Sequence, residues 1–198
     1  MKLSRIAVIV ILLPFLVIAW YQWSYPFKWE RIIYPLEYRE AIATASAKYD
    51  IDPYLISAII YEESKFSPSS ESKVGAIGLM QIMPETGRWI ANKQGRSFTV
   101  DNLYGPNANV DMGCWYFRFL RDKYANDKLA LAAYNSGDKN VDRWLADDKH
   151  STVDEVIEKI PFEETRTYVL RVLKTRKVYE RIYPGEFKED TSPDVAAK

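Results

Sequence analysis

Residues 53–64 read Pro-Tyr-Leu-Ile-Ser-Ala-Ile-Ile-Tyr-Glu-Glu-Ser, and this stretch decides the fold class. Asp52 directly before Pro53 is typical of a helix start, because an Asp side chain caps the first amides and Pro suits the first turn. At about 100° per residue, four apolar side chains share one face of the helix: Leu55, Ile56, Ile59 and Ile60. The pattern predicts a helix packed in a hydrophobic core.

Two adjacent acids, Glu62 and Glu63, follow at the end of this helix. Glu63 falls about 80° from Leu55, in the middle of the apolar face, whereas Glu62 falls at its edge. Burial disfavours a charged carboxylate, so we expect the pKa of Glu63 to be raised, as a general acid at neutral pH requires. An ion pair between Glu63 and a Lys or Arg is an equally good interpretation of the geometry alone.

The remaining sequence is also helical in pattern, without sustained β alternation. We predict further helices at 37–49, 84–94, 107–125, 128–135, 138–146, 153–159 and 163–183. The helix at 107–125 is apolar almost all round, so its aromatic residues are expected to be mainly core: Trp115, Tyr116, Phe117 and Phe119. The sequence therefore predicts one all-α domain over 37–183, followed by a polar, disordered tail at 184–198.

Composition excludes several classes of function. The 198 residues carry 27 basic and 27 acidic side chains, and this balance argues against nucleic acid as a partner. One Cys, Cys114, and one His, His150, leave almost no material for Ser-His-Asp chemistry or for a Cys- or His-based metal site. We expect no metal and no cofactor, and chemistry that rests on carboxylates, hydroxyls and backbone.

The N-terminal residues have the pattern of a membrane segment. Residues 6–20 carry no charge, follow Lys2 and Arg5, and are succeeded by Tyr21 and Trp23. A signal peptide and an uncleaved anchor both fit, and the missing small-x-small cleavage site favours the anchor. We predict a transmembrane helix at 1–23, a linker at 24–36, and a single pass through the cytoplasmic membrane with the domain on the extracytoplasmic side.

A longer motif begins at Glu63. It continues Glu-Ser-Lys-Phe-Ser-Pro-Ser-Ser-Glu-Ser-Lys-Val-Gly-Ala-Ile-Gly-Leu-Met-Gln-Ile-Met-Pro84-Glu-Thr. This run resembles the signature of the soluble lytic transglycosylases, lysozyme-like enzymes that cleave the glycan of the bacterial cell wall. Two later runs also resemble motifs of that family and follow in the same order: Leu131-Ala-Ala-Tyr-Asn-Ser-Gly137 and Ile160-Pro-Phe-Glu-Glu-Thr-Arg-Thr-Tyr-Val169. Ser136 stands where the family usually has Ala.

The resemblance implies a lysozyme-like helical fold, peptidoglycan strands as the partner, and specific roles for several residues. Glu63 would be the one catalytic acid and base, and the sugar O6 would close a 1,6-anhydro ring on N-acetylmuramic acid without water. The substrate-binding positions that the motifs imply are Ser72, Gly78, Met80, Gln81, Tyr134, Asn135, Glu164 and Tyr168. Tyr134 would lie beside the acid, and Glu164 would contact substrate or Tyr134. For Met80 core packing is an equal alternative, and for Glu164 a salt bridge to Arg166 or Arg171 is another. Gly75 and Gly78 would let the backbone turn tightly and approach a sugar ring.

Two other functions stay open. A hydrolytic muramidase on the same fold would use water in place of O6, helped by a second carboxylate such as Asp101 or Asp111. A non-catalytic glycan-binding module would keep the fold but not the acid chemistry, and the intact Glu63 and Tyr134 argue against it.

Overall fold

The structure is a computed structural model that describes residues 10–17, 20, 28–147 and 151–187. The chain divides into two units, residues 1–35 and 36–198. In the first unit, residues 10–17 are helical and exposed, and α2 covers Lys28–Ile33. Within the described ranges, no helix is both long and apolar enough to cross a bilayer. Most of the predicted transmembrane segment, and residues 24–27 of the predicted linker, lie outside the described residues.

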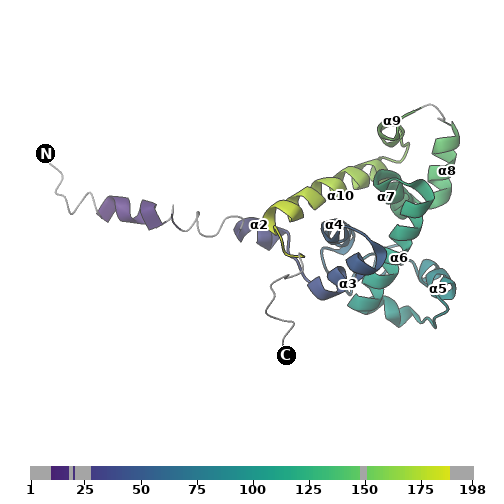
Figure 1. The fold of residues 1–198 in the computed structure, drawn as a ribbon, viewed down its shortest axis with the longest axis horizontal. Coiled ribbons are helices and arrows are strands. Elements are labelled where there is room, and N and C mark those ends of the chain that lie inside the picture. Colours follow the sequence, from purple (N-terminus) through teal and green to yellow (C-terminus); the bar gives the residue numbers. More distant parts are fainter. Residues whose placement is uncertain (1–9, 18–19, 21–27, 148–150, 188–198) are drawn as a thin grey trace, which may run out of the picture. The chain divides into compact units, whose positions relative to one another are not determined.

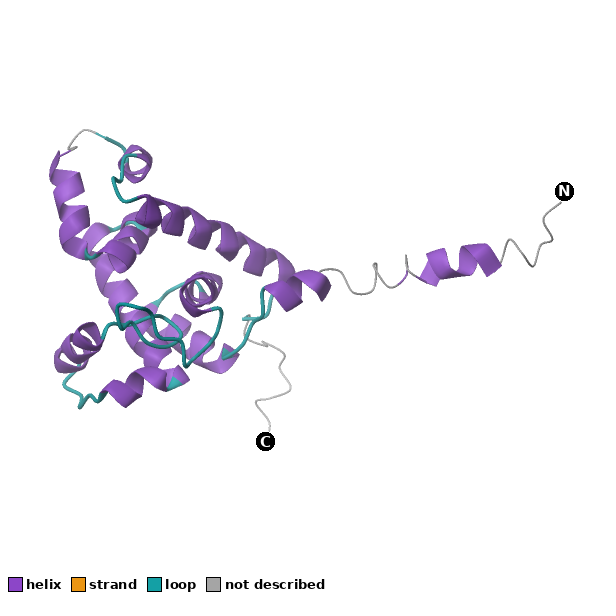
Figure 2. Ribbon diagram, turned by 180° about the vertical axis from the view of Figure 1, so that it is seen from behind, coloured by secondary structure: helices purple, strands orange, loops and turns teal. Residues whose placement is uncertain are grey.

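The second unit is built from helices, and its described residues contain no β-strand (Figures 1 and 2). In chain order they form α3 (Arg39–Tyr49), α4 (Pro53–Ser64), α5 (Pro84–Lys93), the 3₁₀-helix η1 (Val100–Tyr104), α6 (Pro106–Tyr124), α7 (Asp127–Ser136), α8 (Asp138–Asp147), α9 (Val153–Glu158) and α10 (Glu163–Ile182). Every predicted helix is present with ends that agree within two residues. The all-α prediction is confirmed.

Helix α4 is the centre of the core. Its four predicted apolar residues, Leu55, Ile56, Ile59 and Ile60, are at most 1% exposed. Helix α10 is the main packing partner of α4, while α6 packs against α3 and α7. The Asp52 side chain accepts a hydrogen bond from the Tyr54 amide at 3.1 Å, so the predicted N-cap is present.

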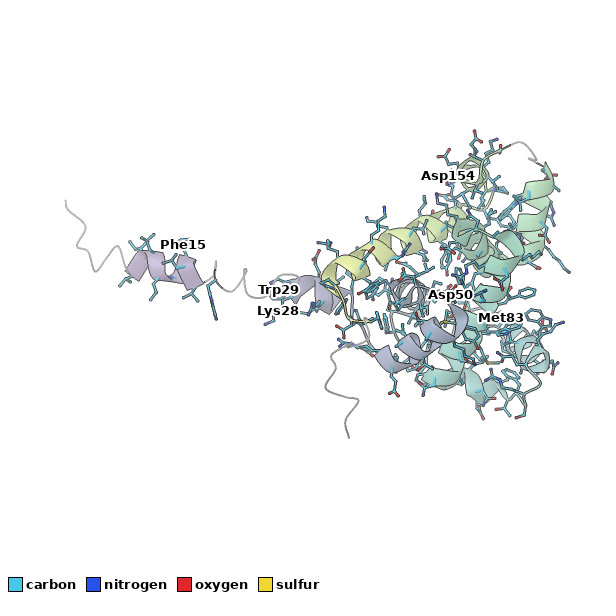
Figure 3. All side chains as sticks on the ribbon, in the orientation of Figure 1. Phe15, Lys28, Trp29, Asp50, Met83 and Asp154 are labelled. Atoms are coloured by element: carbon cyan, nitrogen blue, oxygen red, sulfur yellow. The ribbon has the colours of Figure 1, made fainter. Side chains whose placement is uncertain are left out.

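The chain leaves α4 through two residues in the left-handed region, Lys65 at φ 52° and Phe66 at φ 66°. Left-handed residues cannot continue a right-handed helix, so α4 ends with Glu63 in its last turn. The loop 65–83 then winds back over α4 before α5 starts at Pro84, and Met83, labelled in Figure 3, is the residue before that start.

Two expectations about packing are wrong. Of the four aromatic residues of α6 that were expected in the core, Phe117 is fully buried, whereas Trp115 and Tyr116 are half-buried and Phe119 is 39% exposed. The predicted disordered tail also starts too early, since the Phe187 ring packs edge-on against Tyr54 with centroids 5.4 Å apart. Residues 188–198 lie outside the described part of the chain.

Candidate active site

Glu63 lies in the last turn of α4, half-buried, and makes no ion pair with any residue that the structure describes. The pKa of its carboxyl is raised from 4.5 to about 7, chiefly by burial and to a lesser degree by the nearby charges of Glu62 and Glu164. The Tyr168 hydroxyl and Arg171 act in the opposite direction and lower it. The pKa of Glu63 is therefore raised, as its position on the apolar face of the helix predicts. The interpretation of Glu63 as one half of an ion pair is wrong.

Glu62, in contrast, is held by cationic and hydroxyl partners. Its carboxylate lies 3.2 Å from Arg171 Nε and 3.6 Å from Lys65 Nζ, and it accepts a hydrogen bond from Thr175 Oγ1 at 2.7 Å. The two neighbouring acids thus differ in kind. Glu62 ties α4 to α10 as a paired carboxylate, while Glu63 stays unpaired and is able to exchange a proton near neutral pH.

Two tyrosines lie close to Glu63. The Tyr168 hydroxyl is buried beside the Glu63 carboxyl and makes no hydrogen bond of standard geometry to a described residue. The Tyr134 hydroxyl donates to the Met80 carbonyl at 2.8 Å instead of to the acid. Burial, followed by the charge of Glu63, raises the pKa of both phenols, so both stay protonated at neutral pH and keep a proton to donate.

The loop 65–83 is held against α6 by one buried amide, that of Asn109. Its Oδ1 accepts from the Met80 amide at 2.7 Å, and its Nδ2 donates to the carbonyls of Ile77 at 2.9 Å and Leu103 at 2.7 Å. This role of Asn109 was not predicted from the sequence. A signal was present, because it stands three residues before Met112 and four before Gly113 on the buried side of α6.

Gly78 lies at a tight turn and packs closely against other parts of the protein. Its φ is +81°, and a Cβ there would lie 2.2 Å from the Leu103 carbonyl oxygen and 2.3 Å from Asn109 Nδ2. The close approach is thus to the protein's own Asn109, while the tight turn is confirmed. Gly75 also has a positive φ, of +83°, but faces open space.

Three further predicted site residues lie in the loop 65–83, and their contacts within the protein differ. Ser72 accepts a hydrogen bond from the Ala76 amide at 2.9 Å and shapes the turn. Met80 is fully buried, with its sulfur 4.0 Å from the Cys114 sulfur, so it belongs to the core. Gln81 donates from Nε2 to the carbonyls of Ser70 and Gly78, at 3.1 and 2.9 Å, which orients its amide.

The third predicted motif reaches the same region from α10. Thr165 Oγ1 donates to Asn135 Oδ1 at 2.8 Å, so Asn135 joins the end of α7 to the start of α10. Glu164 is exposed and makes no ion pair with a described residue, because Arg171 is paired with Glu62 and Arg166 with backbone carbonyls. The expected alternative of a salt bridge for Glu164 is wrong.

Neither candidate for a second carboxylate resembles Glu63. Burial alone would raise the pKa of Asp111, but hydrogen bonds from Lys48, Tyr49 and Arg96 hold it below its ordinary value. Asp101 is exposed on η1. Among the described residues, no three His, Cys, Asp or Glu side chains are placed to hold a metal ion.

Comparison with known proteins shows the family of this chain. The family model "Transglycosylase SLT domain" matches residues 40–157, more than half of the chain. This chain belongs to the transglycosylase SLT domain family. Within it, the chain is 34% identical over 162 residues to the soluble lytic murein transglycosylase of Salmonella typhimurium, covering 77% of this chain and 24% of that protein. It is 32% identical over 169 residues to the membrane-bound lytic murein transglycosylase C of Actinobacillus pleuropneumoniae, covering 74% and 46%.

The SLT domain fold is also shared with solved structures. An inactive Glu-to-Gln mutant of a lytic transglycosylase from Pseudomonas aeruginosa superposes with a TM-score of 0.72 at 34% identity, over 76% of this chain and 25% of that one. The chain thus spans about a quarter of the length of the Salmonella and Pseudomonas proteins. The lysozyme-like fold implied by the motifs is confirmed.

Proposed function

We propose that this chain is a peptidoglycan lytic transglycosylase. It cleaves the β-1,4 bond between N-acetylmuramic acid and N-acetylglucosamine without water and leaves 1,6-anhydro-N-acetylmuramic ends. The observation that carries the proposal is Glu63, an unpaired, half-buried carboxyl whose pKa burial raises to about 7. The names of its relatives support the activity class.

One carboxyl performs both proton transfers in this reaction. Protonated Glu63 gives its proton to the glycosidic oxygen, the C1–O bond breaks, and the N-acetyl carbonyl of the muramic sugar bonds to C1. The Glu63 carboxylate then takes the proton of the O6 hydroxyl, and O6 replaces the N-acetyl oxygen at C1 to close the 1,6-anhydro ring. A pKa near 7 suits this cycle, since neither protonation state is strongly favoured at neutral pH.

Other residues position the acid and the sugar. Tyr168, whose buried hydroxyl has no standard hydrogen bond, can donate to Glu63 once the carboxylate forms. Gln81 has its Nε2 occupied by backbone carbonyls, which leaves its amide oxygen to accept from a sugar hydroxyl or N-acetyl N–H. Ser72, Gly78 and Asn135 act on substrate through the backbone that they shape.

The test compares two adjacent acids. Glu63→Gln should abolish release of soluble muropeptides from isolated cell wall, while Glu62→Gln should keep most of the rate. Near-normal turnover by Glu63→Gln contradicts the assignment of the acid. The product decides between transglycosylase and muramidase, because borohydride reduces a hydrolytic muramic end and leaves a 1,6-anhydro end unchanged.

We also propose that residues 1–23 are a retained, single-pass anchor that keeps the domain outside the cytoplasmic membrane. The uncharged run 6–20 supports this, as do the side chains of Trp29, Ile32 and Ile33 on α2, which are 60–70% exposed. Full-length protein should sediment with membranes and resist extraction by high salt. A mature N-terminus mapped after Tyr21, or recovery in the soluble fraction, refutes the anchor.

A further inference from the structure

Four aromatic side chains of α5 and α6 form a connected cluster, which we call the aromatic platform: Trp89, Trp115, Tyr116 and Phe119. The Trp89 ring meets the other three edge-on, with centroids 5.4 Å from Trp115, 6.1 Å from Tyr116 and 5.1 Å from Phe119. Trp115 and Phe119, one helical turn apart, lie nearly parallel at an interplanar angle of 8°. The contacts hold the rings in fixed orientations, as a preformed binding surface requires.

The aromatic platform is only partly covered by protein. Phe119 is 39% exposed, and Trp89, Trp115 and Tyr116 are half-buried, whereas the neighbouring Phe117 is fully buried. Large aromatic side chains usually bury most of their area in a core. Leaving Trp115, Tyr116 and Phe119 of α6 partly exposed therefore costs hydrophobic free energy. Contiguous apolar side chains that stay partly exposed are typical of interaction surfaces.

One end of the aromatic platform adjoins the candidate active site. The Tyr116 ring contacts the Tyr134 ring, with centroids 5.5 Å apart. The Tyr134 hydroxyl in turn donates to the Met80 carbonyl in the loop 65–83, and the charge of Glu63 raises the pKa of this hydroxyl. The aromatic platform is therefore linked to the candidate active site through the packed rings of Tyr116 and Tyr134.

The other end adjoins a polar hollow. A hollow of about 450 Å³ is lined by Trp115 together with Lys48, Tyr49, Gln94 and Arg96. Lys48 and Arg96 both pair with the single carboxylate of Asp111, so the local balance is one positive charge in excess. An aromatic wall beside a few polar donors is the usual composition of a site for a small polar ring.

We propose that the aromatic platform and the polar hollow bind the sugar rings of the glycan strand that lie beyond the cleaved bond. A pyranose ring has one face of C–H groups, which stacks on an aromatic ring, while its substituents reach the donors at the edge. The excess positive charge of the hollow fits the lactyl carboxylate of a muramic residue, a group that is free wherever the stem peptide has been removed. This inference rests on the proposed function for the identity of the strand, but not on the cleavage chemistry.

Binding is measured in a Glu63→Gln background, so that no strand is cut. The probe is insoluble peptidoglycan from which an amidase has removed the stem peptides, and the readout is the fraction of protein that co-sediments as a function of glycan concentration. Trp115→Ala with Phe119→Ala should weaken binding about tenfold, since each ring contributes roughly threefold or more. Leu170→Ala, which truncates an apolar side chain that is 59% exposed on α10, should leave binding unchanged.

The outcomes separate this proposal from the catalytic one. The platform proposal is overturned if the double variant binds glycan within twofold of its Glu63→Gln parent and has the same melting temperature. This holds even if the wild type cleaves glycan. If the double variant binds about tenfold more weakly but the wild type never cleaves glycan, the platform proposal is supported and the proposed function is overturned. If the double variant unfolds, Phe119→Ala and the conservative Phe119→Tyr decide: the first should weaken binding and the second should retain it. Loss of binding only on wall that still carries its stem peptides indicates a peptide site and contradicts the proposal.

Discussion

Replacing the acid should make the protein more stable at alkaline pH. In the folded chain the pKa of Glu63 is raised from 4.5 to about 7, chiefly by burial. Between these values the folded state holds a proton that the unfolded state has released, so stability falls as pH rises from 4.5 through 7. At about 1.36 kcal/mol per pKa unit, the ionised carboxylate costs the folded state up to about 3 kcal/mol. The Glu63→Gln variant has no carboxylate to ionise at this position, so its stability does not fall with pH for this reason.

The assay is thermal unfolding of wild type and Glu63→Gln from pH 4 to pH 9. The two melting temperatures should agree near pH 4 and diverge up to about pH 7, with the variant higher by about 6–12 °C above that pH. Because the other titratable groups are the same in both proteins, their effects cancel in the difference between the two melting temperatures at each pH. Glu62→Gln is the matched control: it weakens the pair with Arg171 at 3.2 Å and should give no gain at any pH. A pH-independent difference, or a less stable Glu63→Gln at pH 9, refutes the argument that Glu63 is buried and unpaired.

Four further outcomes are expected. The rate of glycan cleavage should fall as pH rises above about 7, because ionised Glu63 cannot protonate the glycosidic oxygen; a rate that is flat to pH 9 contradicts this. Tyr168→Phe removes a hydroxyl that lowers the pKa of Glu63, so this falling limb should move to higher pH, as a pH–rate profile will measure. Gly78→Ala should cost at least about 2 kcal/mol in urea unfolding, since its Cβ would lie 2.2 Å from a backbone oxygen. Asn109→Ala should cost about 2–4 kcal/mol in the same assay, because it removes the side-chain partner of the buried Met80 amide and Leu103 carbonyl, while the Ile77 carbonyl still accepts from the Ile82 amide.

Local interactions explain why so much of the helical fold could be predicted. The N-cap of Asp52 and the prolines that open α4, α5 and α6 act within one turn of their own position. The apolar face of α4 likewise depends only on the helical period, and it was enough to single out Glu63 over Glu62. The aromatic residues of α6 could not be assigned in this way, because their exposure depends on which neighbouring helices cover each side.

The sequence by itself thus determined the helices, their order, the motifs and the acid whose carboxyl should resist ionisation, since all of these depend on contacts between near neighbours. Only the tertiary structure decided that Asn109 of α6 holds the loop of Met80, that Arg171 of α10 pairs with Glu62, and that Tyr168 lies beside Glu63. Each of these pairs joins residues far apart in the chain. Their partners are chosen by how α4, α6 and α10 pack, and no local spacing encodes that choice.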